Sequence, residues 1–400
     1  MSASRPLVIQ LLRSFNVEVQ GGGADRFGME LARNLDGSLF DRVVWALWDF
    51  GAPDERHNRD RLERAGIATL AGPSWNESSP YRGWWEAYSF YKANLPNRPA
   101  VIVNTHSEFA DPLAMVLKIH RPGLRIVRSV HIPHAVEWPR KPGRRLVLTN
   151  FLFPLIFDRE IGVAPQITDR LNARWLPRRR RSNAVYLPNS IDLARFSSSP
   201  LDPVPVRKKF SIPADAFLVG AIGRMVEYKG FQDLIDAAEL VIQQAPNVYF
   251  LLVGDGPLLP EIRGRAAESG RNDRIIFAGA QPQIESIYRA FDLFVSPSHA
   301  EGLPTVIMES LAAGIPVVAT DIPGSREIIR DQLNGWMSPA GAPQALAQTI
   351  LAAVNRSDLR QAFAAKGKTD ALNYSIESVA RQYAGLYLSL FKHDTPAVSM

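Results

Sequence analysis

The sequence predicts an α/β protein made of two facing, doubly wound parallel-sheet domains of the Rossmann-like type. Four hundred residues exceed what a single hydrophobic core usually supports. Short, β-rich apolar runs alternate with helical patterns through the whole chain, which is typical of repeated βα units. The alternation restarts after a stretch rich in Ser and Pro, so the chain divides into two halves.

Each half carries its own series of strands and helices. In the first half, strands are predicted near Leu7–Leu12, Val43–Trp48, Ala100–Asn104, Arg125–Val130 and Ile161–Val163, and helices near Arg26–Leu35, Arg82–Ala93, Pro112–Ile119 and Arg145–Phe157. In the second half, strands are predicted near Phe217–Ile222, Val248–Val253, Ile275–Ala278, Leu293–Ser296 and Val317–Thr320, and helices near Phe231–Gln244, Leu259–Ser269, Ile284–Ala290, Thr305–Ala313 and Ser325–Ile329. A long amphipathic pattern over Ser375–Leu390 predicts a final helix after the second sheet.

These patterns predict a domain at residues 1–190, a linker at 191–205, a second domain at 206–374 and a C-terminal helix and tail at 375–400. Ligands of open α/β sheets bind at the carboxyl ends of the strands. We therefore expect a cleft lined by those ends of both sheets.

The composition, with 46% apolar and 22% charged residues, is that of an ordinary soluble globular chain. The chain contains no cysteine, which excludes disulfides, thiolate zinc sites and Cys nucleophiles and fits a reducing cytosol. The N-terminus lacks a convincing signal peptide, and no apolar stretch approaches the roughly 20 residues of a membrane span. We expect a cytoplasmic protein.

Charge is divided unevenly between the halves. Residues 1–190 carry a net charge of +9, whereas residues 191–400 carry −3. Arg178–Arg181 form a basic run, and Lys141, Arg144 and Arg145 lie within or beside the helix predicted to end at Phe157. One interpretation is a peripheral contact with an anionic membrane, and the other is a solvated, solubilising surface. Nucleic acid is not expected, because the basic residues are not interleaved with aromatic residues in a reader motif.

The most informative segment is Ser296–Ser310, SPSHAEGLPTVIMES, in which Glu301 and Glu309 are eight residues apart. Pro304 suits the first turn of a helix, and the helix start directs free N–H groups and a positive dipole at a ligand over Gly302–Thr305, which suits a phosphate. Eight helical residues rise about 12 Å, so the two carboxylates would hold two ends of a long ligand. A nucleotide-diphosphate sugar has that shape. The alternative is a surface helix with two solvated Glu residues.

This segment resembles the E-x7-E motif of retaining GT-B glycosyltransferases of the family-4 type (glycosyl transferases group 1). The resemblance implies a GT-B fold, in which the last helix crosses back onto the first domain. It also implies that Glu301 binds the donor sugar, Glu309 the ribose, and the intervening Gly302, Leu303, Pro304 and Thr305 the diphosphate.

Two further loops resemble the same family. The glycines after the first strand match a glycine pair, here Gly22 and Gly23, that contacts the donor diphosphate. Arg224 and Lys229 follow the first strand of the second half in the spacing GR-x4-KG, and two cations there suit a leaving diphosphate. Since the chain has no Asp-x-Asp, they would take the place of a divalent ion, and no metal is expected. A flexible turn and solvated cations are the alternatives.

The remaining site residues rest on the resemblance as well. Gln281 is the candidate for the nucleotide base. His131, after a first-half strand, would reach the donor sugar near the reacting centre, with His134 as a rival and His106 as a second histidine at the cleft. The PNSID segment resembles the family's hinge, although Ser190 replaces its Gly.

The sequence thus predicts a retaining glycosyltransferase of the hexosyltransferase type. We expect it to move a sugar from a nucleotide-diphosphate sugar to a glycan or lipid-linked acceptor hydroxyl in surface polysaccharide or glycolipid synthesis, with catalysis by His131, Glu301, Arg224 and Lys229. Alternatives are another GT-B activity, such as a sugar-nucleotide epimerase or a sucrose-type synthase, and a non-catalytic nucleotide-sugar-binding subunit. Residues from about 50 to 98 and from about 138 to 182 match no pattern of the family, so the identity of the acceptor is not predicted.

Overall fold

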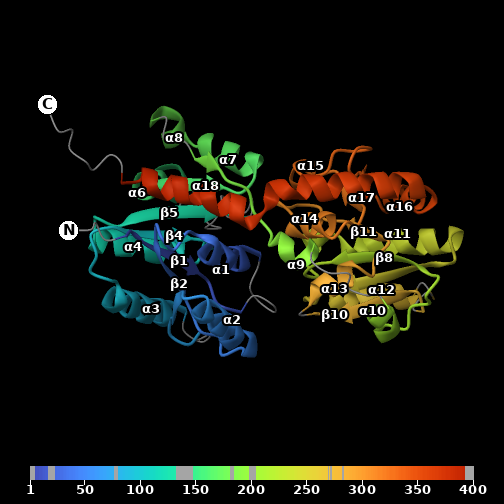
Figure 1. The fold of residues 1–400 in the computed structure, drawn as a ribbon, viewed down its shortest axis with the longest axis horizontal. Helices are drawn as coiled ribbons and strands as arrows, with labels where there is room; N and C mark the ends of the chain where they lie inside the picture. The colour runs from blue at the N-terminus through green and yellow to red at the C-terminus, as the bar shows by residue number, and fades with distance from the viewer. Residues whose placement is uncertain are drawn as a thin grey trace. The chain divides into compact units, whose positions relative to one another are not determined.

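The structure is a computed structural model of the chain, and it describes residues 5–16, 23–75, 80–131, 147–180, 184–197, 204–268, 270, 273–281 and 283–391. The chain forms two compact units (Figure 1). The first contains Met1–Ser190 and Ile376–Met400, and the second contains Ile191–Ser375. Each unit is built on one parallel sheet covered by helices, so the predicted fold class is confirmed.

The first unit has a seven-stranded parallel sheet in the order β3-β2-β1-β4-β5-β6-β7. Its strands are β1 Leu7–Leu12, β2 Asp41–Ala46, β3 Ala68–Ala71, β4 Val101–Thr105, β5 Arg125–Val130, β6 Arg159–Gly162 and β7 Val185–Tyr186. β1 lies between β2 and β4, so the strand order reverses at β1/β4. Such a switch point is where ligands bind in doubly wound sheets.

Helices cover both faces of this sheet. They are α1 Gly23–Asn34, α2 Pro53–Arg64, α3 Pro80–Asn94, α4 Asp111–His120, α6 Phe153–Ile156, α7 Pro165–Asn172, α8 Trp175–Arg180 and α18 Ile376–Ser389, with a π-helical turn at Leu148–Leu152. Alternate strand residues face α1 and α18, through Val8, Ile102 and Val127. Their neighbours face α3, α4 and α6. The C-terminal α18 therefore belongs to the first unit, and it packs against α1 (Figure 1).

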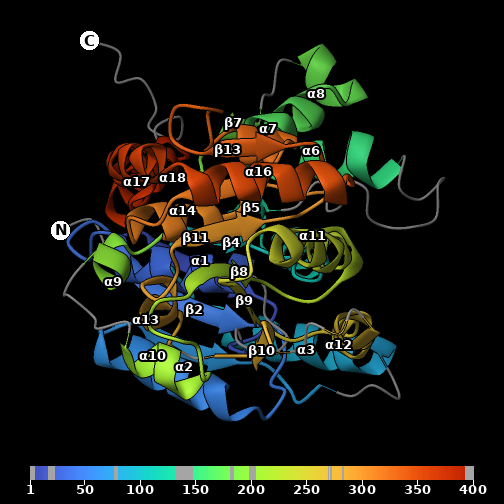
Figure 2. The same cartoon turned by 90° about the vertical axis from the view of Figure 1, so that its right-hand side faces the viewer.

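The second unit has a six-stranded parallel sheet in the order β10-β9-β8-β11-β12-β13. Its strands are β8 Phe217–Ile222, β9 Val248–Val253, β10 Ile275–Gly279, β11 Leu293–Ser296, β12 Val317–Thr320 and β13 Trp336–Ser338. Its helices are α9 Leu193–Ser197, α10 Val204–Lys209, α11 Phe231–Gln244, α12 Leu259–Glu268, α13 Ile284–Tyr288, α14 Thr305–Ala312, α15 Pro323–Arg326, α16 Pro343–Asn355 and α17 Ser357–Ala371, with 3-10 turns at Glu227–Lys229 and Leu372–Tyr374. α11 and α16 lie side by side and share one core with the sheet (Figure 2).

Several elements were not predicted. They are β3, β7, β13, α2, α7, α8, α9, α10, α16 and α17. The 191–205 segment, expected to be a linker, begins with α9, which packs against α14 of the second unit. The helix expected at 145–157 is, in its described part, a π-helical turn followed by the short α6.

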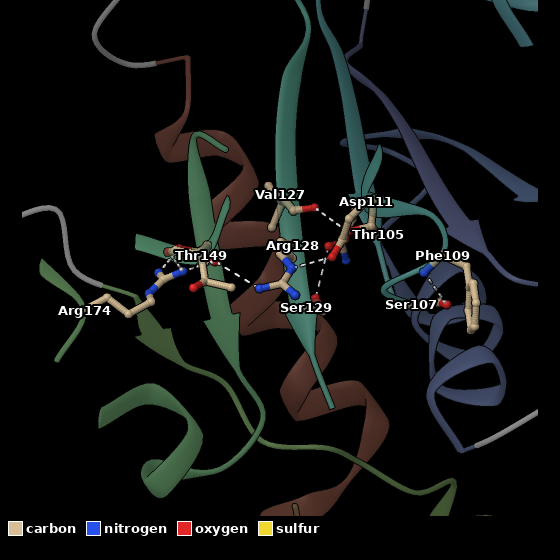
Figure 3. A network of polar contacts seen from close by, with 11 residues as sticks. Thr105, Ser107, Phe109, Asp111, Val127, Arg128, Ser129, Thr149 and Arg174 are labelled. Atoms are coloured by element: carbon tan, nitrogen blue, oxygen red, sulfur yellow. Dashed lines mark hydrogen bonds and ion pairs between the residues drawn. The ribbon is translucent and has the colours of Figure 1, made fainter. Parts of the chain in front are cut away.

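A buried ionic network ties together the part of the first sheet that carries β4, β5 and β6 (Figure 3). Arg128 on β5 donates from Nε to Asp111 Oδ2 at 2.5 Å and from Nη1 to Glu160 Oε1 at 3.3 Å. Arg174 also pairs with Glu160, and Thr105 Oγ1 donates to Asp111 Oδ1 at 2.6 Å. Removing one partner from a buried ion pair typically costs about 3–5 kcal/mol. The network therefore fixes α4 and the α7–α8 junction onto the sheet.

Candidate active site

In the second unit, the loop between β8 and α11 carries both predicted cations. Arg224 follows the end of β8, and its side chain is exposed. Lys229 closes the 3-10 turn Glu227–Lys229 and is mostly buried. The two cations therefore have different surroundings. Among described residues, Arg224 has no ion-pair partner, whereas Lys229 is paired.

Lys229 forms an ion pair with Glu301, the first glutamate of the E-x7-E motif. Ser298 Oγ donates a second hydrogen bond to Glu301 Oε1 at 3.0 Å. Burial acts to lower the pKa of Lys229, but the charge of Glu301 and its hydrogen bond outweigh burial and raise that pKa. Lys229 therefore stays charged at neutral pH. The structure thus joins two predicted donor-site residues that lie 72 positions apart.

Glycines allow the loops of this site to pack closely. Gly230 has φ +67°, and a Cβ there would lie 2.1 Å from the carbonyl oxygen of Pro297. Gly254, after β9, has φ +134°, and a Cβ there would lie 1.9 Å from the carbonyl oxygen of Gly223. Only glycine meets both demands without strain. Gly230 thereby lets the Lys229 loop abut the Ser298 loop, which brings Lys229 to Glu301.

The second glutamate, Glu309, is buried in α14. Tyr288 donates from its hydroxyl to Glu309 Oε2 at 2.9 Å and contacts the carbonyl oxygen of Val306 at 3.0 Å. Thr305 is the first residue of α14, and Pro304 precedes it in an extended conformation. The predicted helix start is therefore present, with the free N–H groups that every helix N-terminus offers. The preceding Gly302 and Leu303 are buried.

Gln281, the candidate for the nucleotide base, lies just after β10. Its Nε2 donates to the carbonyl oxygen of Ala278 at 2.6 Å, and its Oε1 accepts from Lys209 at 2.8 Å. The side-chain amide is therefore engaged within the second unit. A contact with a base stays a prediction.

In the first unit, His131 and His106 lie together after the carboxyl ends of β5 and β4. His131 Nε2 faces His106 Nδ1 at 3.1 Å, and His131 Nδ1–H donates to Asn189 Oδ1 at 2.9 Å. Both ring nitrogens of His131 thus have partners inside the unit. A contact between this ring and a donor sugar would require one of those partners to be replaced. His106 Nε2 in turn faces Gln10 Oε1 at 2.7 Å.

Both histidines are neutral at pH 7. Burial lowers the pKa of His131 to about 4, with the hydrogen bond to Asn189 acting in the opposite direction. Burial and the neighbouring His131 lower the pKa of His106 well below its usual value. Phe27 packs edge-on against both rings, at 5.3 and 5.7 Å between centroids.

The histidine pair continues into a polar chain that ends on α18. Asn104 Nδ2 donates to Tyr387 Oη at 2.9 Å and to Gln10 Oε1 at 3.1 Å. Ser129 Oγ lies 3.3 Å from Tyr383 Oη. Two tyrosines of the last helix thus satisfy polar groups in the middle of the sheet face.

The other predicted positions have simpler outcomes. Gly22 and His134 lie outside the described residues. Gly23 is the first residue of α1 and is exposed. Ser190, where the family has glycine, does not have a positive φ, so its backbone makes no demand for glycine.

Sequence reasoning missed the residues that orient the predicted ones. Asn189 fixes His131, Tyr288 fixes Glu309, and Ser298 supports Glu301. Asn189 lies in the PNSID segment and Ser298 in the SPS segment, so both residues belong to motifs found in the sequence. Their contacts with His131 and Glu301 could not be predicted from those motifs. Within the described ranges, no three His, Asp or Glu side chains come together in a way that would hold a metal ion.

Comparison with known protein families gives a match in the second unit. The profile described as "Glycosyl transferases group 1" matches residues 205–370. The lipopolysaccharide core biosynthesis glycosyltransferase LpsE of Rhizobium meliloti is 37% identical over 184 residues, 46% of this chain and 53% of LpsE. This alignment thus spans about half of that relative. Phosphatidyl-myo-inositol mannosyltransferase of Mycobacterium tuberculosis is 31% identical over 284 residues, 68% of this chain and 73% of that protein.

Solved structures match the whole fold at lower identity. HepE of Anabaena, in complex with UDP and glucose, superposes with a TM-score of 0.80 at 19% identity and covers 96% of this chain and 100% of its own. Sucrose-phosphate synthase of Thermosynechococcus elongatus superposes with a TM-score of 0.78 at 20% identity, covering 98% and 100%. At these identities the likeness concerns the fold.

Proposed function

The chain belongs to the glycosyl transferases group 1 family, and from this premise we propose that it transfers a sugar from a nucleotide-diphosphate sugar to an acceptor hydroxyl with retention of configuration. The observation that carries the proposal is the Lys229–Glu301 ion pair beside the start of α14. A cation that neutralises phosphate and a carboxylate that accepts sugar hydroxyls are already paired there.

The ion pair suggests how donor binding proceeds. An incoming diphosphate competes with Glu301 for Lys229, and the exposed Arg224 offers a second cation at the end of β8. Once Lys229 turns to the phosphate, Glu301 becomes an acceptor for the hydroxyls of the donor sugar. The donor thus replaces one charge pair with two complementary contacts, and it leaves no buried charge without a partner.

In the chemical step, the bond between the sugar C1 and the phosphate oxygen breaks while the acceptor oxygen bonds to C1 from the same face. The acceptor proton passes to the leaving phosphate. Arg224 and Lys229 stabilise the charge that develops on the diphosphate, with no metal ion required. We assign Glu309 to the ribose, Gly22, Gly23 and the segment Gly302–Thr305 to the diphosphate, Gln281 to the base and His131 to the donor sugar.

Nucleotide binding and labelled-sugar transfer test this proposal. UDP, GDP and ADP are screened by thermal shift, because a ligand that binds only the folded state raises the melting temperature. The matching radiolabelled nucleotide sugar is then followed with and without EDTA. The label should reach an acceptor at the same rate with EDTA as without it. Activity lost on chelation and restored by Mg²⁺ or Mn²⁺ would refute the role of the two cations.

The same label separates the rival activities. An epimerised donor would indicate a sugar-nucleotide epimerase. Nucleotide binding without any turnover would indicate a binding subunit. The relatives' names, lipopolysaccharide core and phosphatidyl-myo-inositol, support a glycan or lipid-linked acceptor in surface polysaccharide or glycolipid synthesis.

A membrane contact of the first unit has its own structural support. Phe151 on the π-helical turn and Trp175 on α8 are exposed and have rings 5.0 Å apart, and Leu155 on α6 is a third exposed apolar side chain of these segments. The exposed Arg178 lies on α8, whereas Arg181, at the end of the basic run, and Lys141, Arg144 and Arg145 lie outside the described residues. Apolar side chains beside cations are typical of peripheral contact with anionic lipid. No helix among the described residues is both long and apolar enough to cross a bilayer.

Vesicle co-sedimentation tests this contact. We expect binding to acidic vesicles that weakens as salt rises, since the Debye length is about 8 Å at 0.15 M ionic strength and each nearby cation contributes about 1 kcal/mol. Replacing Arg178–Arg181 with Ser, or Phe151 and Trp175 with Ser, should reduce binding and leave transfer to a soluble acceptor unchanged. Equal binding to neutral and acidic vesicles, or none to either, would favour a solubilising surface.

A further inference from the structure

We infer that Gln10 and Tyr387 are positioning residues, which keep the hydrogen of the His131 ring on Nε2 and leave a lone pair on Nδ1. Gln10 lies on β1 and Tyr387 on α18, so both are far from His131 in the sequence. They act through His106, which lies between Gln10 and His131. The inference rests on the proposed function, because it says how His131 would meet the donor sugar. A sugar hydroxyl would donate its hydrogen to Nδ1.

Four side chains of the first unit form a row with three hydrogen-bonding links, which we call the histidine row. Gln10 Oε1 lies 2.7 Å from His106 Nε2, and His106 Nδ1 lies 3.1 Å from His131 Nε2. His131 Nδ1 lies 2.9 Å from the side-chain amide of Asn189. None of the four residues is more than 8% exposed. Each link therefore has to be made by the side chains themselves.

The number of hydrogens in the histidine row restricts how its ends are oriented. Both rings are neutral at pH 7, because burial lowers the pKa of each, so together they supply two hydrogens. Carbonyl oxygens accept hydrogen bonds and do not donate them. If Gln10 and Asn189 both turned their oxygens to the row, its three links would need three hydrogens. One of the two end amides therefore turns its NH₂ group to the row.

The amide of Gln10 is the fixed end of the row. Its Oε1 also accepts from Asn104 Nδ2 at 3.1 Å, and its Nε2 donates to Tyr387 Oη at 3.2 Å. Asn104 is fixed in turn, because its Nδ2 donates to Tyr387 Oη at 2.9 Å and its Oδ1 accepts from Ser129 at 3.0 Å. Turning Gln10 alone would set two NH₂ groups against each other. Turning both amides would leave the single hydrogen of Tyr387 to serve two oxygens, and it would place the Asn104 oxygen 3.2 Å from the lone pair of His106 Nε2.

The positions of both ring hydrogens follow from this fixed end. Since the Gln10 oxygen faces His106 Nε2, that nitrogen carries the hydrogen and His106 Nδ1 carries a lone pair. His131 then donates from Nε2 to this lone pair, so its own Nδ1 is an acceptor. Considered alone, the contact with Asn189 would make Nδ1 the donor, but the row as a whole reverses it. Asn189 turns its NH₂ group to Nδ1, and a sugar hydroxyl would replace that group as the donor.

The hydroxyl of Tyr387 brings α18 into this arrangement. Tyr387 is fully buried in the apolar layer between α18 and the sheet, where an unpartnered hydroxyl would cost free energy. Its oxygen accepts from Gln10 and Asn104 together, and these two contacts set the orientation of both amides. A buried polar network whose members all have partners specifies one arrangement of its side chains. The last helix thereby determines the hydrogen position on a ring that it does not touch.

Long-range ¹H–¹⁵N NMR spectra of the full chain, labelled with ¹⁵N-histidine, test the inference. Such spectra show which ring nitrogen carries the hydrogen, and His106→Gln and His131→Gln assign the signals of the two rings. We expect Nε2–H in both rings of the wild type at pH 7. Nδ1–H in both rings, different tautomers in the two rings, or a doubly protonated ring would each overturn the inference.

Gln10→Met should reverse both tautomers. It removes the acceptor of the His106 hydrogen, and Asn104 Nδ2, 3.2 Å from His106 Nε2, can then donate to that nitrogen. Both rings should therefore change to Nδ1–H together, with Asn189 Oδ1 as the final acceptor. A residue with a purely structural role would change the melting temperature without moving these hydrogens, so unchanged tautomers in Gln10→Met would overturn the inference.

Tyr387→Phe removes the hydroxyl that orients the two amides, so it should lower the share of Nε2–H in both rings. Tyr383→Phe is the matched control, because it removes a buried hydroxyl from the same helix whose contact is with Ser129 at 3.3 Å and not with Gln10. The control should keep the tautomers of the wild type. Equal effects of the two substitutions would refute the role of Tyr387.

Kinetics connect the hydrogen position to sugar transfer. In Gln10→Met, kcat should fall about tenfold, since His131 would no longer accept a hydrogen bond from the sugar. The Kd of the nucleotide should stay unchanged, because the proposed nucleotide contacts lie in the second unit. Reversed tautomers with an unchanged kcat, or a nucleotide Kd that rises as much as kcat falls, would refute the positioning role. The expected tautomers in a protein that transfers no sugar would support the histidine row and refute the proposed function instead.

Discussion

Breaking the Lys229–Glu301 ion pair should destabilise the second unit, and the losses of the two single variants should not add when both partners are removed. The two side chains are 17% and 11% exposed, so the pair is nearer to a buried ion pair than to a surface one. Lys229→Met leaves Glu301 without its counter-ion, although Ser298 still donates to it. Removing one partner of a buried pair costs about 3–5 kcal/mol.

The remaining serine contact and partial exposure favour the low end of that range. We expect a loss of about 3 kcal/mol for Lys229→Met and about 2 kcal/mol for Glu301→Gln. The double variant leaves no buried charge without a counter-ion, so it should lose only about 2 kcal/mol in total, well below the sum of the two single losses. The coupling between the two sites is then about 3 kcal/mol.

Trp336 provides a local probe, because it is the single tryptophan of residues 191–375 and lies in the core of the second unit. Its ¹⁹F resonance in 5-fluorotryptophan-labelled protein, assigned by Trp336→Phe, reports the unfolding of that unit alone in urea. Single-variant losses that simply add in the double variant would refute the pairing. Nucleotide affinity measured in parallel should fall in Lys229→Met, since the proposed phosphate contact is lost.

Three further results are expected. Gly230→Ala should lower the free energy of unfolding in urea by at least about 2 kcal/mol. Gly314 is also left-handed but has open space where a Cβ would lie, so Gly314→Ala should lower it by only about 1–2 kcal/mol. Equal losses would contradict the close approach at Gly230. Tyr288→Phe should weaken nucleotide binding about fivefold and Glu309→Ala by about 1.5–3 kcal/mol, and calorimetry that finds no change in either would exclude the ribose role. The pKa of His131 is about 4 in the folded state and about 6.5 in the unfolded state, so between these values the unfolded state binds more protons. The neutral ring therefore contributes about 3 kcal/mol to the free energy of unfolding above pH 6.5, and this contribution is lost as the pH falls to 4. Between pH 7 and pH 5 the free energy of unfolding should fall more for the wild type than for His131→Gln, and equal falls would refute the buried neutral ring.

Strands were predictable where both faces of the sheet are covered. β1, β5, β8, β9, β11 and β12 follow the predicted ranges to the residue. In all of them except β5, which carries the buried Arg128 and Ser129, the reason is that a parallel strand buried on both faces is a largely apolar run. β3 was missed because it is a four-residue edge strand that is only partly buried. Such a strand carries neither a long apolar run nor a clear alternation.

Helices were predictable where one face is apolar. α2 was missed because PDERHNRDRLER contains a single large apolar residue, Leu62, and so shows no apolar stripe. Its signals are local instead: Pro53 in the first turn, and Glu55 accepting the N–H of Ala52. A helix of this kind is stabilised by its end and by polar contacts, which a search for periodicity does not detect.

For the candidate site, residue types and loops were predictable but their pairings were not. Lys229 and Glu301 are separated by 72 positions, and His131 and Asn189 by 58. Each belongs to a short motif that can be found by its spacing. The contact between two motifs depends on the strand order within each sheet. In the second sheet this order places the carboxyl ends of β8 and β11 next to each other, and in the first sheet it places the carboxyl end of β5 next to those of β4 and β6.

The position of α18 has a consequence for how the protein is made. Most of the first unit precedes the second unit in the sequence, yet the helix that covers Val8, Ile102 and Val127 and supplies Tyr387 to Asn104 is synthesised after the second unit. At about 5–20 residues per second, the ribosome needs roughly 10–40 s to make Ile191–Ser375 in between. During that time this sheet face lacks its cover. Nascent chains stalled before Ile376 should therefore bind chaperones through the first unit, even when the second unit has folded.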